Sequence, residues 1–146
     1  MFGLVISFTI VAFQAVIGPP EKVRAELNGW CAGWRLAAVM PEVAEEIRAR
    51  TPSWPPNLIP GDFNADGRTD LAMLVDCKGQ VQLFAFVAAS QGFTTYTLDQ
   101  PQPLDPRQFL HLIRKDYGSD AIGVEFEAIG GRAWVWRDGR WQSVGR

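Results

Sequence analysis

The stretch from Asp62 to Asp70, which reads D-F-N-A-D-G-R-T-D, has the residue types and spacing of a metal-binding loop. Asp62, Asn64 and Asp66 alternate along it, so a compact loop can turn all three side-chain oxygens inward. Calcium is a hard ion that prefers about six to eight oxygen ligands. The sequence therefore predicts a loop that holds one calcium ion.

The other positions of this stretch fit the same chemistry. Gly67 stands where the backbone must turn sharply, in a conformation that suits a residue without Cβ. The main-chain carbonyl of Arg68 would then face the ion, and Asp70 would close the shell. Nothing in the loop is soft enough to favour zinc or copper, and magnesium, which keeps several of its waters, suits a crowded protein shell less well.

An Asx-rich turn is the alternative for these residues. In such a turn, Asp and Asn side chains accept hydrogen bonds from nearby backbone N–H groups and no metal is needed. The sequence leaves both arrangements open.

The segment from Gly61 to Met73, G-D-F-N-A-D-G-R-T-D-L-A-M, resembles the calcium loop of FG-GAP and VCBS-type repeats. In that family the loop links β-strands, and the resemblance implies a structural Ca²⁺ here. Members usually carry several copies that form propeller blades, whereas this chain carries one, and one copy cannot close a propeller. The layout also resembles small secreted bacterial proteins with one such loop and a terminal aromatic hairpin. The implied ligands are Asp62, Asn64, Asp66, Arg68 through its carbonyl, and Asp70.

Few other side chains suggest catalysis. His111 is the only histidine, which excludes a His-based metal cluster, and no G-x-S-x-G segment supports a nucleophilic hydrolase. Glu125 and Glu127 lie two apart on an expected strand, a spacing that a glycosidase uses when the carboxylates pair across a cleft, although solvated strand carboxylates are commoner. We therefore predict a non-enzymatic protein, with a small carboxylate-based hydrolase as an alternative.

Three tryptophans near the C-terminus, Trp134, Trp136 and Trp141, are interleaved with arginines on an expected hairpin. Aromatic rings on such a hairpin can form a flat platform for sugar rings or for a protein, so a carbohydrate-binding or adhesion module is a second alternative. The other interpretation places them in the core, because a small interior needs large apolar side chains.

The N-terminal segment and the two cysteines bear on location. Residues 1–18 are nearly all apolar, which predicts a signal peptide, with an uncleaved membrane anchor as the alternative because no Lys or Arg precedes the apolar run. Cys31 and Cys77 suit an oxidising compartment, where they would form a disulfide; two separate buried thiols are the alternative. We expect a secreted or periplasmic protein.

Length and composition set the class of protein. With 146 residues, 47% of them hydrophobic, and a formal net charge of -2, the chain fits one domain and argues against nucleic acid as a partner. We expect a linker at residues 19–28, with a short helix from Glu21 to Asn28 as the alternative, and a single domain at 29–146. Its partner is an unknown protein or glycan, and membrane contact is expected only through the N-terminal segment if it is retained.

Hydrophobic periodicity predicts the elements that position the loop. Pro41 to Arg50 is typical of a short amphipathic helix, and the four prolines from Thr51 to Pro60 favour an extended connection. Trp30 and Trp34 are expected in the core. The fold class is α+β, a mainly antiparallel sheet with β-hairpins and one or two short helices. Strands are expected at 71–75, 81–88, 93–98, 109–115 (strand favoured over helix), 122–129, 133–136 and from 141 onward.

Overall fold

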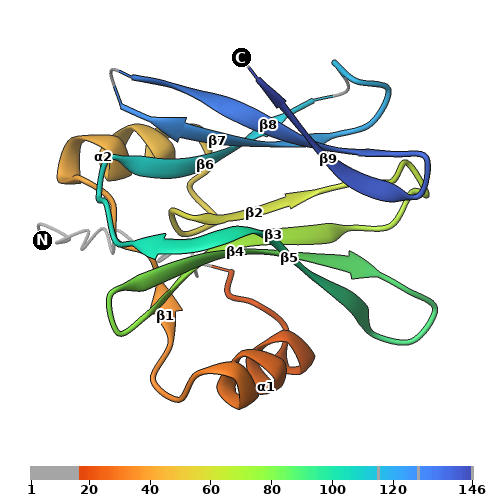
Figure 1. Ribbon diagram of the computed structural model, residues 1–146, viewed down its shortest axis with the longest axis horizontal. Helices are drawn as coiled ribbons and strands as arrows, with labels where there is room; N and C mark the ends of the chain where they lie inside the picture. The colour runs from red at the N-terminus through yellow and green to blue at the C-terminus, as the bar shows by residue number, and fades with distance from the viewer. Residues whose placement is uncertain (1–16, 115, 128, 146) are drawn as a thin grey trace, which may run out of the picture.

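The computed structural model describes residues 17–114, 116–127 and 129–145. Across these residues the chain forms two antiparallel sheets, stacked face to face, and two short helices (Figure 1). This arrangement confirms the expected α+β class and its mainly antiparallel sheet structure.

The predicted signal peptide falls almost entirely on residues 1–16, which lie outside the described residues. The elements are α1 (Glu21–Trp30), β1 (Arg35–Leu36), α2 (Pro41–Arg50), β2 (Leu58–Gly61), β3 (Asp70–Cys77), β4 (Gln80–Ala88), β5 (Phe93–Pro103), β6 (Gln108–Ile113), β7 (Ala121–Phe126), β8 (Gly130–Arg137) and β9 (Arg140–Gly145).

The first sheet is built around the β3–β4 hairpin, which the buried apolar runs predict. Its order is β1-β3-β4-β5, and β2 pairs with β3 beside β1. The second sheet is a meander in the order β6-β7-β8-β9. The β3–β4 and β8–β9 turns place Lys78-Gly79 and Asp138-Gly139 at positive φ, as tight hairpin turns require.

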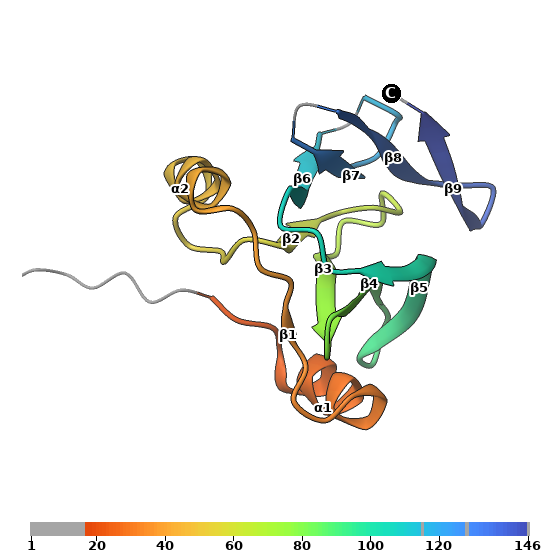
Figure 2. The ribbon, with the colours of Figure 1, turned by 60° about the vertical axis from the view of Figure 1, so that its left-hand side comes forward.

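Both faces of β3 and β4 are covered, which explains why these strands are apolar along nearly their whole length. On the inner face, Leu74 and Leu83 pack with Leu110, Ile122 and Val124 of the second sheet. On the outer face, side chains of the same two strands pack against α1 (Figure 2). Because successive strand residues point to opposite faces, β3 and β4 supply two cores at once.

The polar segment before Trp30 forms a helix, which was the alternative to a linker. Residues 21–30 form α1, and its Val23 and Leu27 are buried in the outer-face cluster. The helix leaves Trp30 on the surface with 43% of its area exposed, which corrects the expected core position. Trp34 is half-buried, and its indole N–H donates to Asn28 (2.8 Å).

The helix expected from Pro41 to Arg50 is confirmed as α2. Its first residue is Pro41, which lacks the N–H that has no partner there. The helix dipole is favoured by Glu42 in the first turn and by Arg48 and Arg50 in the last turn. The proline-rich connection that follows is not wholly irregular, because its last residues form β2. Pro60 is tolerated there since β2 pairs with β3 alone and leaves one side free of ladder partners.

Several strand boundaries differ from the expected ones, and the end of β5 differs most. The strand β5 continues through Pro103 instead of stopping before Pro101. A register shift between Val81 and Leu83 of β4 and a positive φ at Asp99 let the chain bend and pair again. Residues 108–113 form a strand, as favoured. The next strand, β7, ends at Phe126, three residues before the expected limit.

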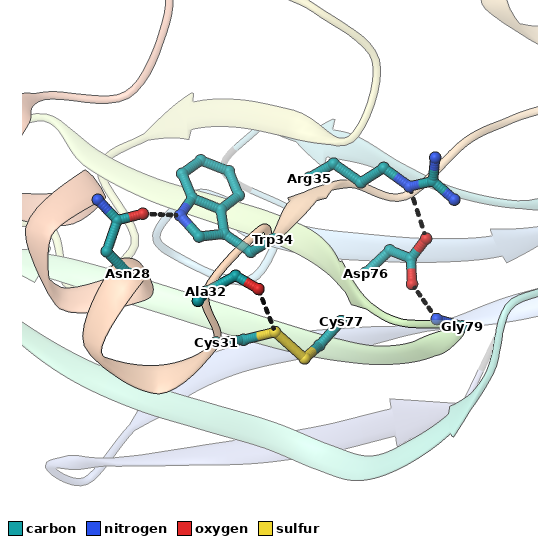
Figure 3. Close-up of a disulfide and its surroundings, with 8 residues drawn as sticks. All are labelled: Asn28, Cys31, Ala32, Trp34, Arg35, Asp76, Cys77 and Gly79. Carbon is teal, nitrogen blue, oxygen red and sulfur yellow. Dashed lines mark hydrogen bonds and ion pairs between the residues drawn. A yellow bond between two sulfur atoms is a disulfide. The ribbon is translucent and has the colours of Figure 1, made fainter.

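A disulfide joins Cys31 at the end of α1 to Cys77 at the end of β3 (Figure 3). Their Cα atoms lie 6.1 Å apart, and the predicted pairing is confirmed. Beside the bridge, buried Asp76 accepts hydrogen bonds from Arg35 Nε (2.9 Å) and from the Gly79 N–H (2.7 Å), so the carboxylate fixes the β3–β4 turn. The disulfide is compatible with an oxidising, extracytoplasmic environment.

In the described part of the chain, neither helix has the length and apolar character needed to cross a membrane.

Candidate metal centre

The Asp62–Asp70 loop connects β2 to β3 and is therefore the turn of an antiparallel pair. Gly61 pairs with Asp70 at the last step of this ladder, which fixes both ends of the loop. Ala65 and Gly67 take positive φ values of 58° and 81°, and a Cβ added at Gly67 would meet no atom within 4 Å. Gly67 is thus required by the backbone conformation and not by crowding.

Asp62 organises the turn through its half-exposed carboxylate. Its Oδ1 accepts the Asp66 N–H (3.0 Å), and its Oδ2 accepts the Gly67 N–H (2.9 Å). These two hydrogen bonds pull the far side of the loop back over its first residue. The side chain expected to be the first ligand therefore also sets the shape of the loop.

Asn64 and Asp66 lie within the same hydrogen-bonded turn. The Asp66 N–H is shared with Asn64 Oδ1 (3.3 Å), and Asn64 Nδ2 donates to Asp66 Oδ2 (3.3 Å). Asp66 Oδ1 accepts the N–H of Arg68 (2.9 Å), an exposed residue. This network is the Asx-rich arrangement considered as the alternative to a metal loop.

Asp70 differs from the other acidic residues because it is fully buried, with 0% of its area exposed. Its Oδ2 accepts the Phe63 N–H (2.8 Å), and its Oδ1 accepts the Ala88 N–H (2.8 Å) at the end of β4. Burial raises the pKa of Asp70, the two N–H donors oppose the increase, and the nearby charges of Asp66 and Asp62 add to it. The carboxylate thus joins the loop to β4.

Asp120, beside the second sheet, is hydrogen-bonded to the first residue of the loop. It immediately precedes β7, its Oδ2 accepts the Asp62 N–H (3.0 Å), and its own N–H donates to the Asp62 carbonyl (3.2 Å). Only 7% of Asp120 is exposed, and its Oδ1 is buried with no hydrogen-bond partner among the described residues. Asp120 was not among the residues predicted from the sequence. Its only signal is the short D-Y-G-S-D stretch before a strand, and that does not reveal which distant loop it meets.

The residues of the loop fit a hard cation in chemistry, although the described side chains do not form a ready-made shell. Within residues 17–114, 116–127 and 129–145, no three His, Cys, Asp or Glu side chains are grouped so that they could hold a metal ion. A carboxylate has about four lone-pair sites, so Asp62, with two accepted N–H bonds, still has sites for a cation. Asp62, Asn64 and Asp66 would supply side-chain oxygens at the surface. Asp70, which also accepts two N–H bonds, keeps lone pairs by the same count, but it is fully buried.

The terminal tryptophans belong mainly to the packed interior. Trp134 and Trp141 are half-buried and pack on the cluster between the sheets, and Trp141 contacts Phe63 of the loop edge to face, with ring centroids 5.8 Å apart. The planes of Trp136 and Trp141 cross at 77°, so these two rings do not form a flat stacking surface. Trp141 instead connects the last hairpin to the residue that follows Asp62.

The other candidate catalytic residues lie on the second sheet. His111 and Glu125 are half-buried on neighbouring strands, with His111 Nε2 and Glu125 Oε1 3.7 Å apart. The imidazole ring covers Gly123, where an added Cβ would overlap it. Glu127 is exposed in the turn after β7. The two glutamates therefore do not form a matched pair on one strand face.

A cavity of about 460 Å³ lies apart from the loop, between α2 and the adjoining parts of β2 and β6. Ile47, Trp54 and Leu112 contribute apolar walls, and Arg50 and Arg114 are among its polar lining residues. Its volume lies within the range of small-molecule sites.

Comparisons with protein-family models, with curated proteins and with solved structures found no match to this chain.

Proposed function

We propose that this chain is an exported, non-enzymatic domain that binds Ca²⁺ through the Asp62–Asp70 loop and uses the ion to stabilise a binding scaffold at the cell envelope or outside the cell. The observation that carries the proposal is the loop itself. It presents Asp62, Asn64 and Asp66 on one short turn whose ends are hydrogen-bonded to both sheets.

Charge and oxygen chemistry support calcium over other ions. The loop offers carboxylate, amide and carbonyl oxygens with no sulfur or imidazole, which is the ligand set of a hard cation. The resemblance to FG-GAP and VCBS-type loops points the same way. The disulfide supports an extracytoplasmic location, where calcium is abundant. The cavity beside α2 supports a binding role.

The expected contribution of the ion is modest. Extracellular calcium modules have Kd values of about 10⁻⁴ to 10⁻³ M, so about 1 mM calcium adds roughly 0.4 to 1.4 kcal/mol to the free energy of unfolding. That gain suits a structural ion more than a signalling switch.

Calorimetric titration of CaCl₂ into the metal-free protein tests the proposal. We expect one saturable site and a higher melting temperature with calcium than with chelator. Asp66→Ala, which removes an exposed loop carboxylate, should abolish the site. An exposed acidic residue outside the loop, Glu127→Ala, is the matched control and should leave both measurements unchanged. A wild-type protein that neither binds calcium nor changes its melting temperature would contradict the proposal.

A further inference from the structure

The cavity beside α2 has walls that hydrogen bonds hold in place. It lies between β2, β6 and the helix, which stands apart from the strands (Figure 2). The Met40 N–H before α2 donates to the Pro106 carbonyl before β6 (2.9 Å). Asn57, which also lines the cavity, accepts the Leu110 N–H (3.0 Å) and donates to the Ala37 carbonyl (2.8 Å). These bonds tie the start of α2 to β6, so we expect the cavity to be present before a ligand binds.

Apolar side chains form most of the cavity wall. Ile47 comes from α2, Trp54 from the connection after the helix, and Leu112 from β6, and all three are half-buried. Water in contact with such a wall is released when an apolar ligand covers it, which favours binding. The ligand that suits this cavity therefore has an apolar body.

The charged residues of the lining favour a negative group on that ligand. They are Glu46, Arg50 and Arg114, and Glu46 is already paired with Arg50 one turn along the helix. Arg114 forms no ion pair with any described side chain. His111, which also lines the cavity, is either neutral or positive. The lining thus has an excess of positive charge, and an arginine guanidinium can bind a carboxylate through two parallel hydrogen bonds.

We infer that this cavity binds a small monocarboxylate with an apolar body, with the carboxylate at Arg114 and the body against Ile47, Trp54 and Leu112. This inference rests on the binding role within the proposed function, and it specifies the class of ligand. It does not depend on calcium, because none of the loop residues from Asp62 to Asp70 lines the cavity.

Calorimetric titration of octanoate into the wild-type protein tests the class of ligand. We expect one saturable site per chain. Octan-1-ol and octylammonium have the same apolar chain without the negative charge, and each should bind at least about 10-fold more weakly. Acetate has the carboxylate without the chain and should show no saturable binding. Equal affinities for octanoate and octan-1-ol would overturn the inference.

Arg114→Gln tests the position of the carboxylate, because the side chain stays polar and loses its charge. Its affinity for octanoate should fall about 10-fold, while its affinity for octan-1-ol should not change. Arg48→Gln is the matched control, since Arg48 is an exposed arginine of α2 outside the cavity lining. Equal octanoate affinities of the two variants would overturn the role of Arg114.

Amide chemical shifts of the wild type locate the site without a substitution. The Ile47 and Leu112 amides should shift along the octanoate titration with the midpoint of the calorimetric signal. The Val135 amide, in a separate buried cluster of the second sheet, should stay constant. Binding that leaves Ile47 and Leu112 unshifted would overturn the inference. So would shifts of these two amides with protein concentration alone, because a second copy of the chain would then occupy the cavity.

The outcomes for octanoate and for calcium are separable. Asp66→Ala should lose calcium binding and bind octanoate as tightly as the wild type. If the wild type binds octanoate in the cavity and no calcium, the calcium function fails and the cavity assignment stands. If it binds calcium and shows no saturable octanoate site, the calcium function stands and this inference is overturned.

Discussion

Asp70 shows how a single buried side chain can hold a loop through hydrogen bonds from the main chain. Its two oxygens satisfy the N–H groups of Phe63 and Ala88, which are 25 positions apart in the sequence and belong to the loop and to the end of β4. Asp120 differs, because its Oδ2 accepts a hydrogen bond while its buried Oδ1 has no hydrogen-bond partner among the described residues. In the FG-GAP resemblance Asp70 is a ligand. The structure adds a main-chain role for Asp70, whose oxygens keep further lone pairs.

Replacement of Asp70 by alanine should destabilise the calcium-free protein by about 2 to 5 kcal/mol, because two buried N–H donors lose their acceptor. Urea unfolding in the presence of chelator measures this cost apart from metal binding. Asp66→Ala, at an exposed position of the same loop, should change the free energy of unfolding by less than about 1 kcal/mol. Equal effects of the two variants would show that Asp70 does not fix the loop.

The residue types of the loop could be predicted from the sequence, but the distant partners of Asp62 and Asp70 could not. Alternating Asp62, Asn64 and Asp66 and the turn at Gly67 are local features, and local spacing is visible in a single sequence. The contacts of Asp70 with Ala88 and of Asp62 with Asp120 join residues 18 and 58 positions apart. Such pairings depend on how the sheets stack, which local patterns do not encode.

At the scale of elements, strands with strong alternation or continuous apolar runs were predictable, and those shaped by tertiary contacts were not. The β3–β4 and β8–β9 hairpins follow from apolar strands around Gly-containing turns. The sequence left α1 open between a linker and a short helix because its polar positions outnumber Val23 and Leu27, the two residues that bury it. The strand β5 continues past Pro101 because a bulge permits pairing that proline normally interrupts.

The Cys31–Cys77 disulfide connects α1 to the sheet that it covers and should account for much of the stability of that contact. Its cysteines are 46 positions apart, and restriction of the unfolded chain by such a loop is worth about 4 kcal/mol in the chain-entropy model. The double variant Cys31→Ser with Cys77→Ser should therefore lose roughly 2 to 4 kcal/mol in urea unfolding.

Reductant provides the control for the disulfide. It should lower the unfolding midpoint of the wild type toward that of the double variant and leave the double variant unchanged. If the oxidised wild type and the double variant unfold at the same urea concentration, the bridge does not stabilise the domain.

At the scale of the whole molecule, the two sheets have separate strand ladders but share one core and several side-chain links. Buried Asn57 donates to the Ala37 carbonyl (2.8 Å) and accepts the Leu110 N–H (3.0 Å), which joins the chain before β2 to the second sheet. An Arg132–Asp99 ion pair links β8 to β5. The Asp62–Asp120 contact adds a further link at the acidic loop. These contacts predict that the sheets unfold together.

Leu110 tests this cooperativity because it is 2% exposed and packs between the sheets. Leu110→Ala removes buried methyl groups and should lower the free energy of unfolding by about 2 to 5 kcal/mol. Amide hydrogen exchange should report the same loss at Ala85 in β4 and at Val124 in β7, since amides that exchange only through global unfolding share one free energy. Ile129→Ala, at a side chain that is 69% exposed, should leave both amides unchanged. If protection fell at Val124 alone, the second sheet would open independently of the first.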